Sequence, residues 1–295
     1  MRIKQAIAVG FVAMAPVLTG CLSHTYKVPK TRPAPVVMSA TQDQLLTQVE
    51  TRFNQIQSLK ATVEIVSAEG GARQGQVIQH PSFSGYIFLR KPQDLRVLLR
   101  LPILGSEALD MVSDGKAWKL WIPHYKKAWT GTGENPDPAE HGVEALRPSV
   151  IRDPLLVRGL GPGQVVSLTQ DSRIIQNDKN KKDLIEEPEY DLEILEEPKG
   201  QTAHPVRVIH IGRSTLLPYQ QDIYGPDGTV VTRAFYSNYQ MFGDVSFPMK
   251  IEIRRPQDQL SLTITITQLS LNQKLEDDQF ELKIPDGVPI KTMNE

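Results

Sequence analysis

The stretch that decides the fold is FSGYIFLRKPQDLRVLLRLP (residues 83–102), followed closely by SEALDMVSDGKAWKLWIPHYKKAWTG (residues 106–131). Apolar residues recur at every second position, and this period places alternate side chains on opposite faces of a strand. Turn residues at Lys91–Asp94 and Ser113–Gly115 fold the run back on itself. The pattern predicts an antiparallel meander.

The second face of this meander is also apolar. Tyr86, Phe88 and Leu98 alternate with the set that contains Phe83 and Leu95. A sheet that is apolar on both sides has to cover both, either with helices or by curling around its own interior. We therefore expect a mainly β fold with a few helices as cover.

The rest of the chain continues the β pattern. Short strands separated by regularly spaced turns are typical of a barrel or sandwich rather than a parallel sheet. The further predicted strands are 61–66, 165–169, 190–195, 206–211, 216–224, 230–239, 245–254 and 260–271. The highly charged segment 176–188 is predicted to be an exposed hairpin tip.

One amphipathic helix is predicted before the sheet, over residues 41–60 (TQDQLLTQVETRFNQIQSLK), with Thr41 or Ser39 as its cap. Its apolar stripe, at spacings of three and four, consists of Leu45, Val49, Phe53, Ile56 and Leu59. This stripe either covers the core or forms a movable wall of a cavity. Residues 140–159 predict one or two short helices interrupted by prolines.

The N-terminus has the pattern of an export signal. Basic Arg2 and Lys4 precede an apolar run at 6–15 that is too short to span a bilayer comfortably. Leu18–Cys21 resembles the lipobox of bacterial lipoproteins, which implies an acylated Cys21; the alternative is a buried thiol after an ordinary signal. We expect a signal peptide over 1–20, an acylated cysteine and tether over 21–40, and a single domain over 41–295.

The resemblance to a lipobox also predicts the localisation of the mature chain. Leu22, rather than aspartate, after the cysteine favours the outer membrane, with the chain facing the periplasm and anchored through lipid on Cys21. Two or more acyl chains hold a protein on a membrane far more durably than one. Cys21 is also the only cysteine, so we expect no intramolecular disulfide and no cysteine metal site.

Three groups of residues, in this order, resemble the LolA/LolB-like lipoprotein-localisation family. The first is Gly85 and Phe88 with Arg90–Pro92; the second is Ser113–Lys116 with Trp121 and Pro123; the third is Phe280 with Ile284–Val288. The resemblance covers residues 41–288 and implies an antiparallel unclosed β-barrel, or half-barrel, with a helical lid over an apolar cavity. Family members carry the acyl chains of lipoproteins across the periplasm.

With its lipobox, the chain looks more like the lipidated receptor of that family than its soluble carrier. Lys91 stands where the carrier has a functional arginine, and lysine offers a point charge instead of a forked donor, so latching of the lid as in the carrier is in doubt. We expect Lys91 to contact the lid or the cargo. By spacing, Leu101, Ile103 and Leu104 match the receptor's protruding apolar loop.

The leading functional hypothesis is therefore binding of acyl chains in an apolar cavity and delivery of lipoproteins or lipids to the outer membrane. We expect a monomer whose partners are membrane lipid, acyl-chain cargo and a soluble periplasmic carrier. The residues predicted to line the cavity are Leu45, Val49, Phe53, Ile56, Ile87, Leu99 and Trp121. The alternative is an envelope scaffold or interaction lipoprotein of the same fold without cargo.

The sequence contains little that indicates a metal site, an enzyme or nucleic-acid binding. The six histidines are scattered without metal-ligand spacing, no Gly-x-Ser-x-Gly motif is present, and a formal net charge of -1 does not favour nucleic acid. We expect no enzyme activity, no metal and no cofactor besides the lipid on Cys21. A carbohydrate-binding module or cryptic hydrolase would need carboxylates beside Trp118 or Trp121.

Overall fold

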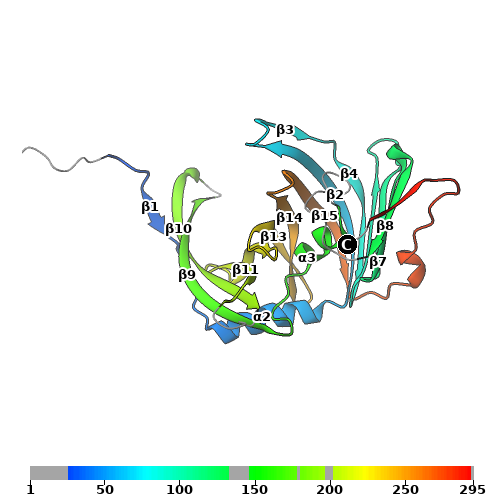
Figure 1. Ribbon diagram of the computed structural model, residues 1–295. Helices are drawn as coiled ribbons and strands as arrows, with labels where there is room; N and C mark the ends of the chain where they lie inside the picture. Colours follow the sequence, from blue (N-terminus) through cyan, green and yellow to red (C-terminus); the bar gives the residue numbers. More distant parts are fainter. Residues whose placement is uncertain (1–25, 133–145, 178–179, 197–201, 294–295) are drawn as a thin grey trace, which may run out of the picture. The chain divides into compact units, whose positions relative to one another are not determined.

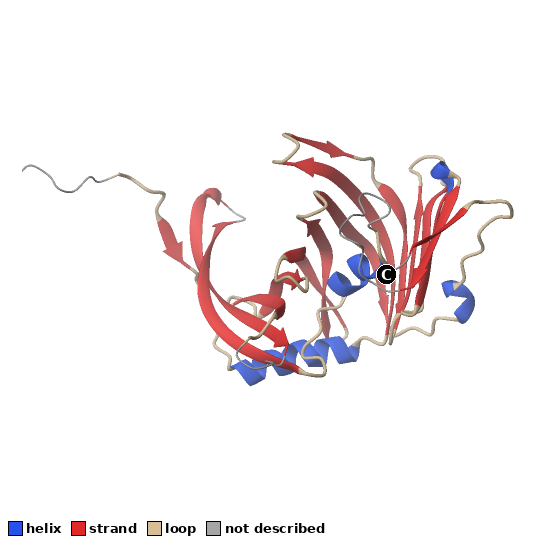
Figure 2. Ribbon diagram, in the orientation of Figure 1, coloured by secondary structure: helices blue, strands red, loops and turns tan. Residues whose placement is uncertain are grey.

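The computed structural model describes residues 26–132, 146–177, 180–196 and 202–293 (Figures 1 and 2). The chain forms two compact units: residues up to Pro33 with Ile174–Glu186, and Ala34–Arg173 with Glu187–Glu295. Cys21 and the predicted signal lie outside the described residues, and their roles stay predictions. Among the residues with described positions, no helix combines the length and the apolar character needed to cross a membrane.

Strands make up most of the fold. In chain order they are β1 (Thr31–Pro33), β2 (Ser58–Gly71), β3 (Gln76–Gln79), β4 (Phe83–Arg90), β5 (Asp94–Arg100), β6 (Glu107–Ser113), β7 (Ala117–Ile122), β8 (Lys127–Thr132), β9 (Gln164–Asn177), β10 (Asn180–Glu196), β11 (Pro205–Gly212), β12 (Leu217–Tyr224), β13 (Val230–Phe242), β14 (Val245–Arg255), β15 (Leu260–Leu271) and β16 (Ile290–Met293). The helices are α2 (Gln42–Gln55) and α3 (Pro148–Leu155), with single 3-10 turns η2 (Pro123–Tyr125) and η4 (Asp277–Phe280).

The strands of the second unit pair in the order β9–β10–β11–β12–β13–β14–β15–β2–β4–β5–β6–β7–β8–β16. Neighbours are antiparallel from β10 through to β8, whereas β16 runs parallel to β8. Among the described residues no pairing joins β9 to β16, so the sheet does not close on itself. The predicted unclosed antiparallel barrel with helices against it is confirmed.

The meander over residues 83–131 forms as predicted. In β4 and β5, buried residues alternate with half-buried ones, and the buried set includes Ile87, Leu89, Leu95 and Val97. Gly85 belongs to the same face and sits under the neighbouring strand: a Cβ atom built there would lie 2.0 Å from the carbonyl oxygen of Leu98. Only glycine fits this close approach of two backbones.

Helix α2 begins as predicted and ends sooner. The Thr41 hydroxyl accepts a hydrogen bond from the Gln44 N–H, while the Gln44 side chain accepts one from the Thr41 N–H, which completes a capping box. The helix ends at Gln55, so the prediction that it reaches Lys60 is wrong. Leu59 lies in β2 and is buried there against β4, because an apolar residue of this spacing also suits a buried strand.

Two further features differ from the predictions. A short hairpin that was not predicted lies before the meander, in which β3 pairs with the end of β2. The tether predicted over residues 21–40 is ordered in part: β1 pairs with Leu184–Glu186 inside the first unit. In the second unit, Arg213 donates hydrogen bonds to the Met38 carbonyl and the Ser39 hydroxyl. Segment 31–40 is therefore held by pairing and does not act as free spacer.

The outer face of β10, β11 and β12 carries a network of charges. The His210 ring lies 2.7 Å from a carboxylate oxygen of Asp191, its directly paired neighbour on β10. Burial disfavours the charged ring, but the hydrogen bond to Asp191 and the negative charges of Asp191, Asp222 and Glu189 outweigh it and raise the pKa of His210. Arg233 holds Asp222 through two contacts of 2.8 Å.

Gly85→Ala is expected to destabilise the chain, because the new methyl group would force β4 and β5 apart at the Leu98 carbonyl. Overpacking of this kind costs about 1–3 kcal/mol in free energy of unfolding. Gly71→Ala is the matched control, since its nearest neighbours would lie 3.8 Å or more from the added atom. Denaturant unfolding measures both; equal stability of the two variants would contradict the close approach.

The His210–Asp191 pair is expected to stabilise the fold most at low pH. A folded pKa raised above the unfolded value means that this stabilisation is complete below about pH 6.5 and is lost as pH rises through the folded pKa. Asp191→Asn should therefore lower the free energy of unfolding by about 1.5–3 kcal/mol at pH 5.5 and by much less at pH 8.5.

The control for this pH dependence is Asp286→Asn, which changes an exposed carboxylate distant in sequence from the pair. Its effect on unfolding should be small at both pH values. A loss in Asp191→Asn that is the same at pH 5.5 and pH 8.5 would show that ionised His210 does not contribute.

Candidate functional site

Lys91 fixes the end of α2 against the sheet. Its Nζ atom donates a 2.5 Å hydrogen bond to the Phe53 carbonyl oxygen in the last turn of the helix and lies 3.5 Å from the centre of the Phe53 ring. A cation at a helix C-terminus is favoured by the helix dipole. Burial lowers the pKa of Lys91. Lys91 therefore contacts the helix that covers the sheet, and its role in latching a lid or contacting cargo stays a prediction.

A small cavity lies beneath α2 and α3, where both helices contact β14. Its volume is about 30 Å³. The lining is mostly apolar with two tyrosines and one arginine: Arg52, Phe53, Ile56, Leu155, Leu156, Val157, Pro218, Tyr236, Tyr239, Ser246, Phe247 and Pro248. Ligand pockets for drug-sized molecules measure about 300–1,000 Å³, so this space holds a small group and not an acyl chain as it stands.

The residues predicted to line a cavity are divided between two apolar clusters. Leu45 and Val49 of α2 pack with the apolar residues of β10 and β11. Ile56, Ile87 and Leu99 are buried in the larger cluster, against which Phe53 packs. Of the predicted set, Phe53 and Ile56 line the 30 Å³ cavity. The lining role of Leu45, Val49, Ile87 and Leu99 stays a prediction.

The placement of Trp121 on the cavity side is wrong. Trp121 pairs with Asp110, and Asp110 pairs with Leu98, which faces away from the Ile87 and Leu99 side of the sheet. Trp118 points to the inner face instead and is buried in the larger cluster. A shift of one residue reverses the face of a strand residue, and sequence alternation alone does not choose between the faces.

The loop between β5 and β6 has an exposed apolar tip. Between β5 and β6, Ile103 and Leu104 are 104% and 77% exposed, whereas Leu101 at the base is half-buried. The base is closed by hydrogen bonds from the Leu101 N–H to the Ser106 carbonyl and from the Gly105 N–H to the Leu101 carbonyl. Ile103 has a φ of 69°, which a β-branched residue rarely adopts. Its role in membrane contact stays a prediction.

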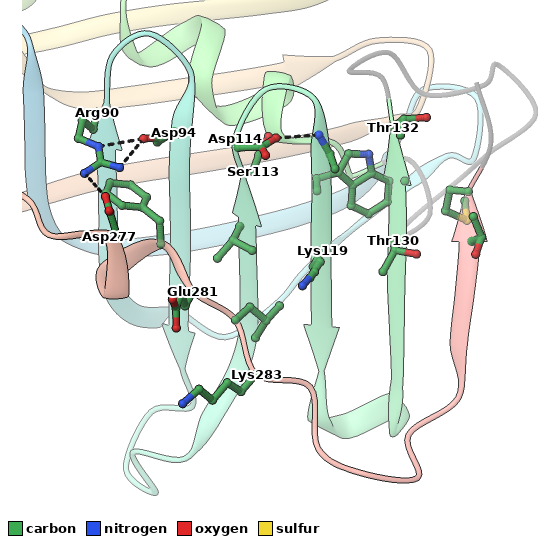
Figure 3. A pocket seen from close by; sticks show the side chains of 18 residues that line it. Arg90, Asp94, Ser113, Asp114, Lys119, Thr130, Thr132, Asp277, Glu281 and Lys283 are labelled. Atoms are coloured by element: carbon green, nitrogen blue, oxygen red, sulfur yellow. Dashed lines mark hydrogen bonds and ion pairs between the residues drawn. The ribbon is translucent and has the colours of Figure 1, made fainter.

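A larger groove, of about 760 Å³, lies between the C-terminal segment and strands β6–β8 (Figure 3). Its edge is built by Arg90, which contacts both Asp94 and Asp277 at 2.8 Å and stacks on the Phe280 ring. Lys119, Thr130 and other polar groups line the remainder (Figure 3). The charges nearest Arg90 are already paired, so this end of the groove holds the C-terminal segment in place.

The structure also brings together residues whose closeness in space could not be seen from their spacing in the sequence. Ligand atoms of Glu189, Asp191 and His210 lie within 4.8 Å of one another, on two neighbouring strands. The hydroxyl of Tyr219 donates to Glu189, and Asp191 accepts from the Nδ1 atom of His210, so both carboxylates already have partners. Burial raises the pKa of Glu189 despite the Tyr219 bond. We interpret the cluster as part of the charge network and keep the expectation of no metal.

Arg52 is a second residue that sequence reasoning missed. It lies three residues after Val49 and seven after Leu45, on the same side of α2, and lines both the 30 Å³ cavity and a groove of about 560 Å³ along the helix. Burial lowers its pKa, while the nearby Tyr239 acts in the opposite direction. A cation at the mouth of an apolar cavity attracts anionic groups. The sequence signal that could have identified Arg52 is its helical spacing from Leu45 and Val49.

No protein-family model matches the chain, and no curated protein matches its sequence. Among solved structures, it is similar to a LolA superfamily protein from Nitrosomonas europaea (13% identity, 80% of this chain and 97% of that chain covered, TM-score 0.48). It is also similar to an outer membrane lipoprotein-sorting protein domain from Vibrio parahaemolyticus (11%, 80% and 94%, 0.49) and a DUF1329 family protein from Desulfovibrio piger (16%, 80% and 94%, 0.49). Likenesses at this level do not establish what the chain binds.

Proposed function

We propose that the chain is a non-enzymatic envelope lipoprotein, anchored through Cys21 to the outer membrane, that shelters acyl chains beneath α2 and α3 and helps to deliver lipids or lipoproteins. The observation that carries the proposal is the exposed apolar loop at Ile103 and Leu104. These side chains are 104% and 77% exposed at the tip of a hairpin that hydrogen bonds hold closed. A rigid apolar tip of this kind suits insertion into a lipid surface.

The strained backbone of the loop supports the same proposal. A left-handed conformation at a non-glycine residue costs of order 1–3 kcal/mol, and such residues cluster at ligand contacts and switch regions. Ile103 adopts it and projects its side chain fully into solvent. Neither feature contributes to packing of the described core. Contact with a membrane accounts for both.

The interior must adapt to receive an acyl chain. The space beneath α2 and α3 measures about 30 Å³, so the chain would enter by displacing apolar side chains of the helices. Helix α3 is short, contains Pro154 and contacts only one face of the sheet through β6 and β14. Helix α2 buries only Leu45 and Val49 over fourteen residues, whereas α3 buries five of its eight, so movement of α2 exposes less apolar surface for its length.

A second candidate, an interaction module without cargo, is favoured by one observation. Residues on the inner face of the sheet are packed into continuous apolar clusters, with Ile87 and Leu120 at 0% exposure. A filled interior has no need of a ligand. In this case the exposed loop would dock a protein partner, and no lipid would accompany the purified chain.

Replacement of Ile103 and Leu104 by Asn is expected to weaken binding to lipid vesicles about tenfold, because two apolar side chains no longer enter the bilayer. Asn is chosen since it tolerates the left-handed backbone at Ile103. The measurement is co-sedimentation of residues 22–295, which lack the acylated cysteine, with phosphatidylethanolamine and phosphatidylglycerol vesicles.

The matched control replaces Val77 and Ile78 by Asn, since both are exposed apolar residues of another hairpin, at 65% and 52%. This variant should bind vesicles as the parent does. Equal binding by all three proteins would exclude the β5–β6 loop as a membrane contact.

Residues 22–295, exported to the periplasm behind a cleavable signal, are expected to purify with about one acyl-chain lipid per chain. Val157→Trp should abolish this, because the added ring occupies the cavity that Val157 lines. Val165→Trp, at a 40% exposed site on β9, is the control and should retain the lipid. Native mass spectrometry gives the stoichiometry; a parent protein free of lipid would favour the module without cargo.

A further inference from the structure

Three buried polar side chains lie in a diagonal line on the inner face of the sheet. Ile209 of β11 pairs with Gln221 of β12, which pairs with Ala234 of β13. Arg207 and Tyr236 lie two residues from Ile209 and Ala234 and therefore share their face. The pairing directions place Arg207 on one side of Gln221 and Tyr236 on the other, at diagonal positions that long side chains can bridge.

All three side chains are more than nine-tenths buried. Arg207 and Tyr236 are each 5% exposed and Gln221 is fully buried. Among the described residues, neither amide atom of Gln221 has a hydrogen-bond partner, nor do the Arg207 Nε or the Tyr236 hydroxyl. Almost every buried polar group in a folded protein is paired, so three neighbouring exceptions require an explanation.

The unpaired groups are mostly donors. Arg207 is a cation, Tyr236 offers a hydroxyl hydrogen and Gln221 offers an amide N–H. Burial lowers the pKa of Arg207 to about 10, with the charge of Arg158 acting in the same direction, so the guanidinium remains charged at neutral pH. Burial also raises the pKa of Tyr236 well above its usual value, which keeps its proton in place. The cluster is suited to an oxygen acceptor, above all an anionic one.

The current partner of Arg207 is a loop carbonyl. Its Nη1 donates a 3.2 Å hydrogen bond to the Arg158 carbonyl oxygen, in the segment that follows α3. Asp153 of α3 acts electrostatically on both Arg207 and Tyr236, but it is ion-paired with Arg152 at 3.4 Å. The repulsion between Arg158 and Arg207 is therefore not cancelled by a direct contact, and an incoming carboxylate would relieve it.

Tyr236 connects this line to the cavity. It lines the 30 Å³ space together with Leu155, Leu156 and Phe247, so the apolar cavity meets the cluster at Tyr236. That volume matches the share of one water molecule in the liquid, about 30 Å³, and suits a single small polar group. The ligand class that fits is amphiphilic, with one oxygen-bearing end and a hydrocarbon chain.

We propose that Arg207, Gln221 and Tyr236 form an interior subsite that binds the carboxylate or ester carbonyl at the head of an acyl chain, while the hydrocarbon lies beneath α2 and α3. This inference rests on the proposed function, because it names the orientation of the same cargo. It goes further because it assigns selectivity to a polar cluster. Apolar burial alone would not distinguish an acyl chain from a plain hydrocarbon, whereas the polar cluster would.

The test uses the full chain with Cys21→Ser, so that no covalent lipid competes, and palmitate labelled with ¹³C at its carboxyl carbon. Arg207→Met should weaken palmitate binding about 10- to 100-fold, the range for hydrogen bonds to charged groups, and Tyr236→Phe and Gln221→Leu by about 3- to 10-fold. Gln220→Leu, the next residue of β12 on the opposite face, is the control and should bind as the parent does.

A spectroscopic reading separates binding at the subsite from binding elsewhere. Next to Arg207 the carboxyl resonance should keep its ionised position from pH 9 to pH 5, whereas in Arg207→Met it should titrate. Methyl palmitate, which lacks the charge, should lose less affinity than palmitate in Arg207→Met. If ester and acid are equally sensitive to all three substitutions, the head group recognised is an ester carbonyl of bound lipid, and the subsite stands.

Stability provides the check on folding. Tyr236→Phe and Gln221→Leu remove unpaired polar atoms, so they should leave the unfolding midpoint of the ligand-free chain unchanged or raised. Palmitate binding that is unaffected by all three substitutions would overturn the subsite while leaving acyl binding intact. Absence of palmitate binding by the parent chain would overturn both the subsite and the proposed function.

Discussion

Lys91 joins helix α2 to the sheet through one charge-assisted contact, and the cover of the interior depends on it. The inner face of β4 and β5 is apolar, so it requires a covering element. The helix supplies Phe53 for this purpose, whereas its Val49 packs against β10 and β11, and α2 also contacts β14. The 2.5 Å bond from Lys91 to the Phe53 carbonyl fixes the C-terminal end of the helix.

The neighbouring residue makes the corresponding contact on the opposite side of the sheet. Arg90 donates to the Leu275 carbonyl and pairs with Asp277, which holds the C-terminal segment over the outer face. Arg96 reinforces this through the Gln279 carbonyl. Two adjacent basic residues at the end of β4 thus serve both faces of a sheet that is apolar on both sides. The alternation of a strand makes this division possible.

Much of this fold follows from the sequence, because its signals are local. The alternation in β4 and β5, the Asp114–Gly115 turn and the Thr41 cap depend on residues close together in the chain. The loop at Ile103 is predicted from the spacing of its apolar residues, and its exposed tip is likewise a property of a short segment. The start of α2 is predicted correctly because its cap is also a local signal.

The incorrect predictions concern features that depend on residues far apart in the sequence. Leu59 fits both a helix and a buried strand, and its pairing with β4 settles the choice. The face of Trp121 depends on strand register, which the turn after Ser113 sets. Arg207, Gln221 and Tyr236 come from three strands and show no common pattern in the sequence. Their relationship exists only after β11, β12 and β13 have paired.

The filled interior is compatible with acyl binding when the energies are compared. Moving Leu45, Val49, Phe53 and Ile56 into water would cost about 6–12 kcal/mol, at 1.5–3 kcal/mol for each side chain. Burying a sixteen-carbon chain returns about 12 kcal/mol, at 0.8 kcal/mol for each CH₂. The difference is about 0–6 kcal/mol in favour of binding. A small difference suits the proposed delivery role, because a deep preformed cavity would bind too tightly to release cargo. With a difference this small, the polar contacts of the proposed Arg207 subsite would decide the direction of exchange.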